Sequence, residues 1–298
     1  MTDPRLTLVL SLLLLAPATA AQEQPPRSPP EAEKGPDEKD LVHDYDKSMK
    51  SKDPAARAAA VMALGDLSRE LADKGTSRYL AKALAKALED EDLEVQSAVV
   101  AQMSWGRDVD TTLDALGGHV EAVREAVEKR ITRPDEESKT YVNRATRLFG
   151  DTAQSLANYR DDRSVDLLAS CMGKLHANTE SNDTSTRLVG RLAEALLSLG
   201  TEEAVRTCVR QTQQYSESDG FQEPAAKELH RVLAIFATRV GKAPPDFTQN
   251  YYVDWDNWFE KHKDGFPKKL GKIKEPPMTI PSGTDPMAPQ DDGGAAPR

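Results

Sequence analysis

The sequence predicts an all-α fold: an α-solenoid of about five to six helical hairpins, disordered at both ends. Composition is the first reason, because 30% of the residues are charged and only 5% are aromatic. Solvated helices have this balance, whereas β-sandwiches and barrels are rich in aromatic and β-branched residues. Helical periodicity over residues 40–243 is the second reason, and an internal repeat is the third.

The repeat is clearest between residues 49–67 and 88–106, which align at an interval of 39 residues. In this alignment Asp53 takes the place of Asp92. A weaker third copy is expected at residues 119–131. An interval near 40 residues with two helices per unit is typical of an α-solenoid.

Turn residues indicate where the helices begin and end. Asp53 and Asp92 are expected to cap the helices that follow them, because an aspartate accepts hydrogen bonds from the free N–H groups of a first turn. Gly65, Gly106 and Gly200 are expected to end helices in the C′ position. Further helices are predicted at about 75–90, 138–157, 161–177, 184–199, 201–215 and 222–241.

Residues 88–106, and less closely 49–67, resemble HEAT repeats, a family of armadillo-type α-solenoids. Its consensus runs leucine, an acidic turn, then Val-Arg, small residues and leucine. The resemblance implies polar ladders between units, in which Asp90 matches the turn aspartate and Arg57 and Arg124 match the arginine. It also implies a scaffold that binds partners on an extended surface.

The first 20 residues have the pattern of a cleavable signal peptide. Arg5 precedes the apolar run Leu6–Leu15, and Ala18 and Ala20 supply small residues for cleavage before residue 21. The apolar run is too short to span a bilayer, which needs about 20 residues. We therefore expect an exported protein, periplasmic or extracellular, with no membrane span after cleavage.

Composition then divides the chain into five parts. Pro- and Glu-rich or Pro- and Gly-rich segments without large apolar groups cannot bury enough surface to become ordered. The expected parts are a signal peptide (1–20), a disordered linker (21–39), a HEAT-like repeat domain (40–243), an aromatic capping helix (244–266) and a disordered tail (267–298).

Aromatic residues are concentrated near the end of the repeat region. Trp255, Trp258 and Phe259 follow i, i+3, i+4 spacing and therefore share one helical face. The segment resembles the Trp-x-x-Trp-aromatic tail that closes some bacterial exported HEAT-type proteins. One hypothesis makes this face a stacking platform for sugars. The favoured hypothesis is a cap, because the last unit of a solenoid has an apolar face that must be covered.

Two smaller features complete the sequence-based expectations. A basic cluster from Lys261 to Lys274 is predicted to be a solvated tail, with weak contact to an anionic surface or polymer as the alternative. Cys171 and Cys208 are expected to be buried, unpaired thiols on equivalent helices. Packed helices lie about 8–10 Å apart, whereas a disulfide needs Cα atoms closer than about 7 Å.

No constellation of residues in the sequence indicates catalysis, a metal or a cofactor. A formal net charge of −10 argues against binding to nucleic acid, which requires a basic face. The leading hypothesis is a non-enzymatic scaffold that binds a protein partner through its helical-repeat surface. The alternative is a cell-surface or polysaccharide-binding module that uses the C-terminal aromatic and basic segment. A lyase-like enzyme is the least favoured of the three.

Overall fold

The computed structural model describes residues 38–70, 78–104, 106, 108–131, 133, 135–175, 182–217, 223–246 and 251–273. The expected signal peptide and most of the expected linker lie outside these residues, as do residues 274–298. Within the described ranges there are eleven α-helices and no strand. They are α1 (Glu38–Ser48), α2 (Pro54–Glu70), α3 (Arg78–Ala87), α4 (Leu93–Met103), α5 (Val109–Arg130), α6 (Glu136–Asn158), α7 (Asp162–Lys174), α8 (Asn182–Leu199), α9 (Glu202–Glu217), α10 (Glu223–Arg239) and α11 (Tyr251–His262).

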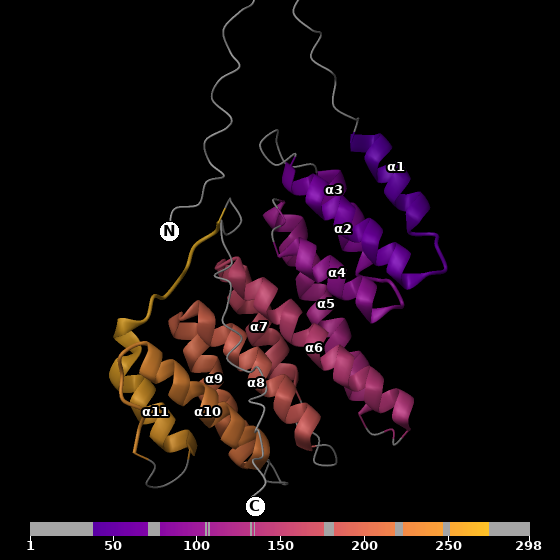
Figure 1. Cartoon of the computed structure of the whole chain (residues 1–298). Coiled ribbons are helices and arrows are strands. Elements are labelled where there is room, and N and C mark those ends of the chain that lie inside the picture. The colour runs from indigo at the N-terminus through magenta and orange to yellow at the C-terminus, as the bar shows by residue number, and fades with distance from the viewer. Residues whose placement is uncertain are drawn as a thin grey trace, which may run out of the picture. The chain divides into compact units, whose positions relative to one another are not determined.

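The helices of the unit from Glu38 onward form two layers, which Figure 1 shows in chain order. Helices α1, α3, α5, α7, α9 and α11 form the A layer, in which each helix packs on the next. Helices α2, α4, α6, α8 and α10 form the B layer in the same way. Each A helix and the B helix that follows it make one hairpin, so there are five hairpins, and α11 then covers α9. This arrangement confirms the predicted α-solenoid.

A continuous apolar core lies between the two layers. It runs from Tyr45 in α1 to Phe266 after α11, and core leucines such as Leu113 and Leu116 are fully buried. Apolar side chains at helical spacing give each helix one core-facing stripe and leave its charged residues outside. The core therefore follows directly from the periodicity of the sequence.

Aspartate side chains begin helices along the whole chain. Asp92 Oδ1 accepts a hydrogen bond from Glu94 N at 2.8 Å, and Asp53 Oδ1 accepts one from Ala55 N at 3.1 Å. Asp135 does the same for α6, through Ser138 N at 2.6 Å. These oxygens satisfy N–H groups that have no partner inside the helix.

The expected third copy of the repeat, residues 119–131, is placed wrongly by the sequence alignment. This segment is the second half of α5, a 22-residue helix of the A layer, whereas the alignment assigned it to the helix that follows the turn, as in α4. The B-layer helix of the third hairpin is α6, at residues 136–158. Because α5 is long, the B-layer helix of the third hairpin begins later in the sequence than the repeat interval of 39 residues predicts.

Two of the three expected C′ glycines are also wrong. Gly200 has φ +66° directly after α8, a backbone conformation that favours glycine. Gly106 has no positive φ, and Gly65 lies inside α2. A Cβ on Gly65 would collide with the side chain of Gln102 in α4, so this glycine lets neighbouring B helices approach closely.

The tail does not begin at Pro267, as the sequence predicted, because residues 267–273 pack against the repeat domain. We call this segment the C-terminal strap. Gly271 O accepts the backbone N–H of Asp162 at 3.1 Å, and Pro267 O accepts that of Glu202 at 3.0 Å. The strap thus completes the first turns of α7 and α9, whose N–H groups need external partners.

Side chains of the first turn of α7 bind the strap in return. Leu270 N donates to Asp162 Oδ1 at 2.7 Å, and Ile273 N donates to Asp161 Oδ2 at 3.2 Å. Leu270 and Ile273 also pack on the hydrophobic core. Composition alone could not reveal this order, because a short extended strap needs specific acceptors rather than many apolar residues.

Candidate binding surface

The matched ladder residues Arg57 and Asp90 form one rung between the first two hairpins. Arg57 Nε lies 2.8 Å from Asp90 Oδ2, and Arg57 NH2 lies 2.8 Å from Asp90 Oδ1. Both side chains are 10% exposed or less. Desolvation raises the pKa of Asp90, but the Arg57 hydrogen bonds and the Asp92 N–H lower it overall, so the carboxylate stays charged.

The next rungs of the expected ladder differ from the family pattern. Gln96 stands where the arginine would lie, and its Nε2 donates to the backbone oxygen of Asp90 at 2.5 Å. Arg124 makes no rung and instead pairs within α5, with Glu121 at 3.1 Å and Glu128 at 2.5 Å. It lies in the misplaced third copy, which explains why the motif match failed there.

The three aromatic residues of α11 that share one face in the sequence are buried. Trp255, Trp258 and Phe259 are 0%, 5% and 2% exposed, which leaves no free ring face for stacking on a sugar. The Trp258 indole N–H donates to Ala243 O at 2.8 Å, and the Trp255 N–H donates to His230 Nδ1 at 3.2 Å. Since α11 packs on α9, it covers the A-layer helix of the fifth hairpin.

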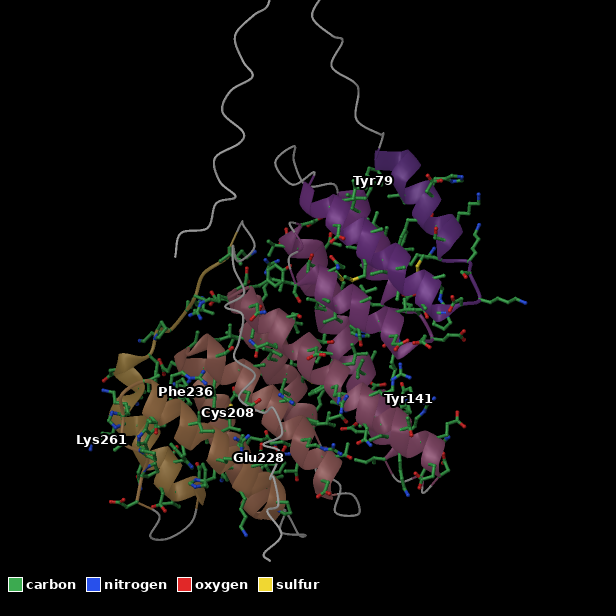
Figure 2. The ribbon with its side chains drawn as sticks, viewed as in Figure 1. Tyr79, Tyr141, Cys208, Glu228, Phe236 and Lys261 are labelled. Carbon is green, nitrogen blue, oxygen red and sulfur yellow. The ribbon has the colours of Figure 1, made fainter. Side chains whose placement is uncertain are left out.

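The lysines that accompany this segment remain on the surface. Lys261 projects outward from α11 (Figure 2), and Lys268, Lys269 and Lys272 of the C-terminal strap are exposed. Lys263 pairs with Glu260 at 2.5 Å. Lys274 lies outside the described residues. Lys261 and Trp258 line one surface hollow, but the indole there is 5% exposed and offers no free face for stacking on a sugar.

Both cysteines are buried and free, on the neighbouring helices α7 and α9. Burial raises the pKa of the Cys171 thiol to about 12 and raises that of Cys208 further. Thiolates are the reactive form of cysteine, so these two residues act as small apolar side chains.

Buried titratable groups elsewhere do not gather into a site. Burial lowers the pKa of His119 to about 4, which keeps this imidazole neutral. Among the described residues, no three His, Cys, Asp or Glu side chains are grouped so that they could hold a metal ion. No helix in the described ranges has both the length and the apolar character needed to cross a membrane.

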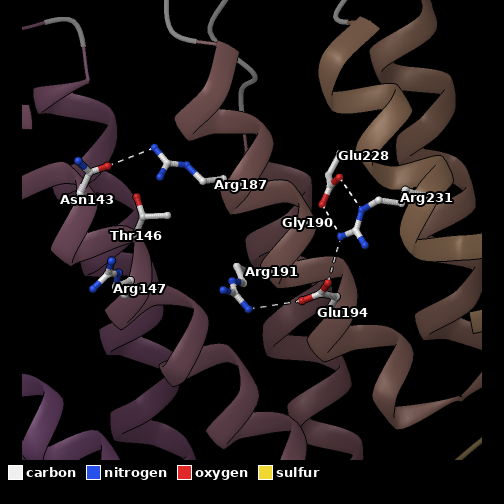
Figure 3. Close-up of a pocket in the computed structure, with 9 residues that line it drawn as sticks. All are labelled: Asn143, Thr146, Arg147, Arg187, Gly190, Arg191, Glu194, Glu228 and Arg231. Atoms are coloured by element: carbon white, nitrogen blue, oxygen red, sulfur yellow. Dashed lines mark hydrogen bonds and ion pairs between the residues drawn. The ribbon is translucent and has the colours of Figure 1, made fainter. Parts of the chain in front are cut away.

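A polar hollow crosses three consecutive helices of the B layer, α6, α8 and α10 (Figure 3). Its volume is about 350 Å³. We call it the B-layer groove. It is lined by Asn143, Thr146, Arg147, Arg187, Gly190, Arg191, Glu194, Glu228 and Arg231.

The groove differs from one end to the other in how its arginines are paired. At the α10 end, Arg231 lies 2.7 Å from Glu228 and 3.2 Å from Glu194, so its charge is balanced. The hydrogen bonds that Arg231 donates to Glu228 raise the pKa of Arg231 further above its usual range. With one guanidinium and two carboxylates, this end has no excess positive charge.

At the α6–α8 end the guanidinium groups lack close carboxylates. Arg187 donates to the neutral Asn143 Oδ1 at 3.2 Å, and Arg191 reaches Glu194 only at 3.7 Å. Within the described part of the chain, Arg147 makes no hydrogen bond or ion pair. Partial desolvation raises the pKa of the nearby Asp151, and the charges of Arg191 and Arg147 offset this only in part.

Two glycines inside B-layer helices make room for side chains of the groove. A Cβ on Gly150 of α6 would lie 3.1 Å from Cδ of Arg191, so its absence lets the Arg191 stem cross this helix. A Cβ on Gly190 of α8 would collide with the Glu228 carboxylate. Glycine inside a helix costs about 1 kcal/mol relative to alanine, and here it leaves space that these charged side chains occupy.

Sequence reasoning missed this groove because its members are far apart in the chain and match no motif. A signal was nonetheless present: Asn143, Arg187 and Arg231 recur at intervals of 44 residues, as do Arg147 and Arg191. Polar residues that recur at the repeat interval on the exposed side of the second helix indicate a continuous surface. The interval of 39 found in the first two hairpins does not reveal it.

The helix arrangement defines the chain as an α-solenoid of helical hairpins. No family model matches it, and no curated protein does. It is similar to an engineered protein solved by a structural genomics consortium, with 18% identity over 68% of this chain and 98% of that one and a TM-score of 0.25. It is also similar to a designed armadillo repeat protein, with 16% identity over 66% of this chain and 98% of that one and a TM-score of 0.23.

Proposed function

We propose that this protein is an exported, non-enzymatic scaffold that binds a protein partner on the outer face of its B layer. The B-layer groove carries the proposal. It is a hollow that spans three repeat units, and helix-interior glycines leave room in it for the side chains of Arg191 and Glu228. Repeat proteins form extended binding surfaces of this kind by stacking neighbouring helices.

The proposed location follows from residues 1–20, which have a charged start, a short apolar run and small residues at the expected cleavage site. The protein would act in the periplasm or outside the cell. Sequencing the N-terminus of the mature protein should return Ala21. A mature protein that begins at Met1 or Thr2 would contradict export by this route.

Photo-crosslinking tests the binding face. A photoreactive amino acid at Gln154, an exposed position of α6 in the B layer, should crosslink one defined protein in the native compartment. The same amino acid at Arg210, exposed on α9 in the A layer, is the matched control and should crosslink much less of it. Equal crosslinking from both positions, or none from Gln154, would contradict a B-layer binding face.

A further inference from the structure

The unbalanced arginines of the B-layer groove indicate what kind of ligand it binds. Arg147, Arg187 and Arg191 lie on two adjacent helices, α6 and α8, with no carboxylate within 3.5 Å of their guanidinium groups in the described structure. Elsewhere in this chain, Arg57 and Arg231 have carboxylates at 2.8 Å and 2.7 Å. These three arginines outnumber the carboxylates near them, Asp151 and Glu194, and an excess of like charge favours an anionic ligand.

We propose that the α6–α8 end of the B-layer groove binds an extended acidic peptide segment of the partner, through Arg147, Arg187 and Arg191. This inference rests on the proposed scaffold function and names the chemistry of its ligand. The planar guanidinium group presents paired N–H donors that match a carboxylate. Asn143 and Thr146, also in the lining, supply neutral hydrogen-bonding groups beside the arginines.

The spacing of the helices fits a peptide. Packed helices lie about 8–10 Å apart, and an extended chain in the polyproline II conformation rises about 3.1 Å per residue with three residues per turn. Two acidic side chains three residues apart therefore lie on the same side of the peptide, about 9 Å apart, and can each meet an arginine from a different helix. Toward α10 the ligand should become uncharged, because Arg231 is already balanced by Glu228 and Glu194.

The net charge of the whole chain distinguishes a local basic site from general electrostatic attraction. With a formal net charge of −10, the protein as a whole repels acidic peptides and attracts basic ones. Binding of an acidic peptide at 0.15 M salt, where the Debye length is about 8 Å, must then come from a local basic site. The carboxylates of Glu194 and Glu228 in the same groove disfavour a polyanion, such as a nucleic acid, that would run across all three helices.

The test measures binding of a fluorescein-labelled deca-glutamate peptide to the full mature chain by fluorescence anisotropy. Saturable binding is expected, with deca-glutamine of the same length binding at least tenfold more weakly. Arg147→Gln, Arg187→Gln and Arg191→Gln should each weaken binding by about three- to tenfold, as expected for lost charge-assisted hydrogen bonds. The triple variant should show no saturable binding.

Arg210 is an exposed arginine on α9, so Arg210→Gln removes the same charge from the A layer. This variant should keep an affinity within about twofold of the parent. If net charge alone controlled binding, Arg210→Gln would weaken it as much as the groove variants do. Each variant is compared only if its thermal unfolding matches that of the parent. Arg191→Lys should lose affinity although its charge remains, because lysine lacks the planar fork.

Three results would overturn the inference: no saturable binding of deca-glutamate, equal binding to the triple variant, or displacement of the peptide by pyrophosphate at equal or lower concentration, which would indicate a small-anion site. The scaffold proposal fails differently. If it is wrong, the Gln154 crosslinker captures no partner. If only the peptide inference is wrong, the crosslinker captures one partner equally with the parent and with the triple variant.

Discussion

Replacing Trp258 with alanine should unfold the C-terminal end of the solenoid before the rest. The indole is 95% buried, since its exposed fraction is 5%, and it packs edge-on against Trp255 with ring centroids 5.3 Å apart. A tryptophan buries about 150–250 Å², which at about 25 cal/mol per Å² stabilises by about 4–6 kcal/mol. Because the alanine keeps a small share of this burial and neighbours relax, a loss of about 3–5 kcal/mol is expected.

Hydrogen exchange measured by mass spectrometry is the assay, because it locates the loss. Units of a solenoid contact mainly their neighbours, so α9, α10 and α11 should exchange faster while α2 and α4 keep the protection of the parent. Trp258→Phe keeps most of the packing and removes the N–H bond to Ala243 O, and should cost about 1 kcal/mol. Tyr79→Ala, at a residue that is 61% exposed, should cost less than about 0.5 kcal/mol.

The reasoning would be refuted if Trp258→Ala exchanged and melted like the parent. Burial of the rings would then contribute nothing to stability, and another role for the aromatic face of α11 would have to be sought. Uniform loss of protection along the whole chain would contradict the local part of the reasoning, because it would show that the hairpins unfold as one block.

Three further predictions follow from buried polar groups. Arg57→Ala and Asp90→Ala should each lower the melting temperature, and the double variant should lower it by less than the two together, because either single change leaves a desolvated charge without its partner. For Asp161, burial raises the pKa, but hydrogen bonds from Arg163 and the Ile273 N–H lower it overall, so its contribution to stability should be present above about pH 4 and lost as pH falls through the folded pKa. The protection factors of the strap amides, which correct for the pH dependence of intrinsic exchange, should therefore fall in acid, and less so in Asp161→Asn, which keeps an acceptor oxygen. Mass spectrometry of non-reduced peptides should find Cys171 and Cys208 as free thiols, and a peptide linking them would contradict this.

The fold could be predicted from the sequence because it depends on local, repeated information. Helical spacing and aspartates at helix starts are readable within about ten residues, and the Arg57–Asp90 rung follows from aligning two neighbouring units. Arg124 was misassigned because the apolar spacing of residues 119–131 is the same in an A-layer helix as in a B-layer helix. Periodicity defines a buried face but does not say which layer the helix belongs to.

The candidate site could not be predicted in the same way. Arg147 and Arg191 are distant in sequence and line the same groove only because α6 and α8 are neighbours in one layer. The role of Gly150 beside them depends on how closely these two helices pack, which is a property of the tertiary structure. The C-terminal strap was missed for a related reason, since its order comes from acceptors on Asp161 and Asp162, more than 100 residues earlier.

The strap has a consequence for how the protein is made. In most solenoids each unit can fold as soon as its neighbour has emerged from the ribosome, because contacts are local. Here Gly271 O accepts the first N–H of α7, and the Asp162 and Asp161 side chains accept from Leu270 and Ile273, which are 108 and 112 residues later in the chain. The fourth and fifth hairpins therefore remain unfinished until almost the whole chain has been synthesised, whereas the first three do not have to wait. A chain stopped before residue 267 would leave the first N–H groups of α7 and α9 without their partners in the strap, so premature termination weakens helices that were translated long before.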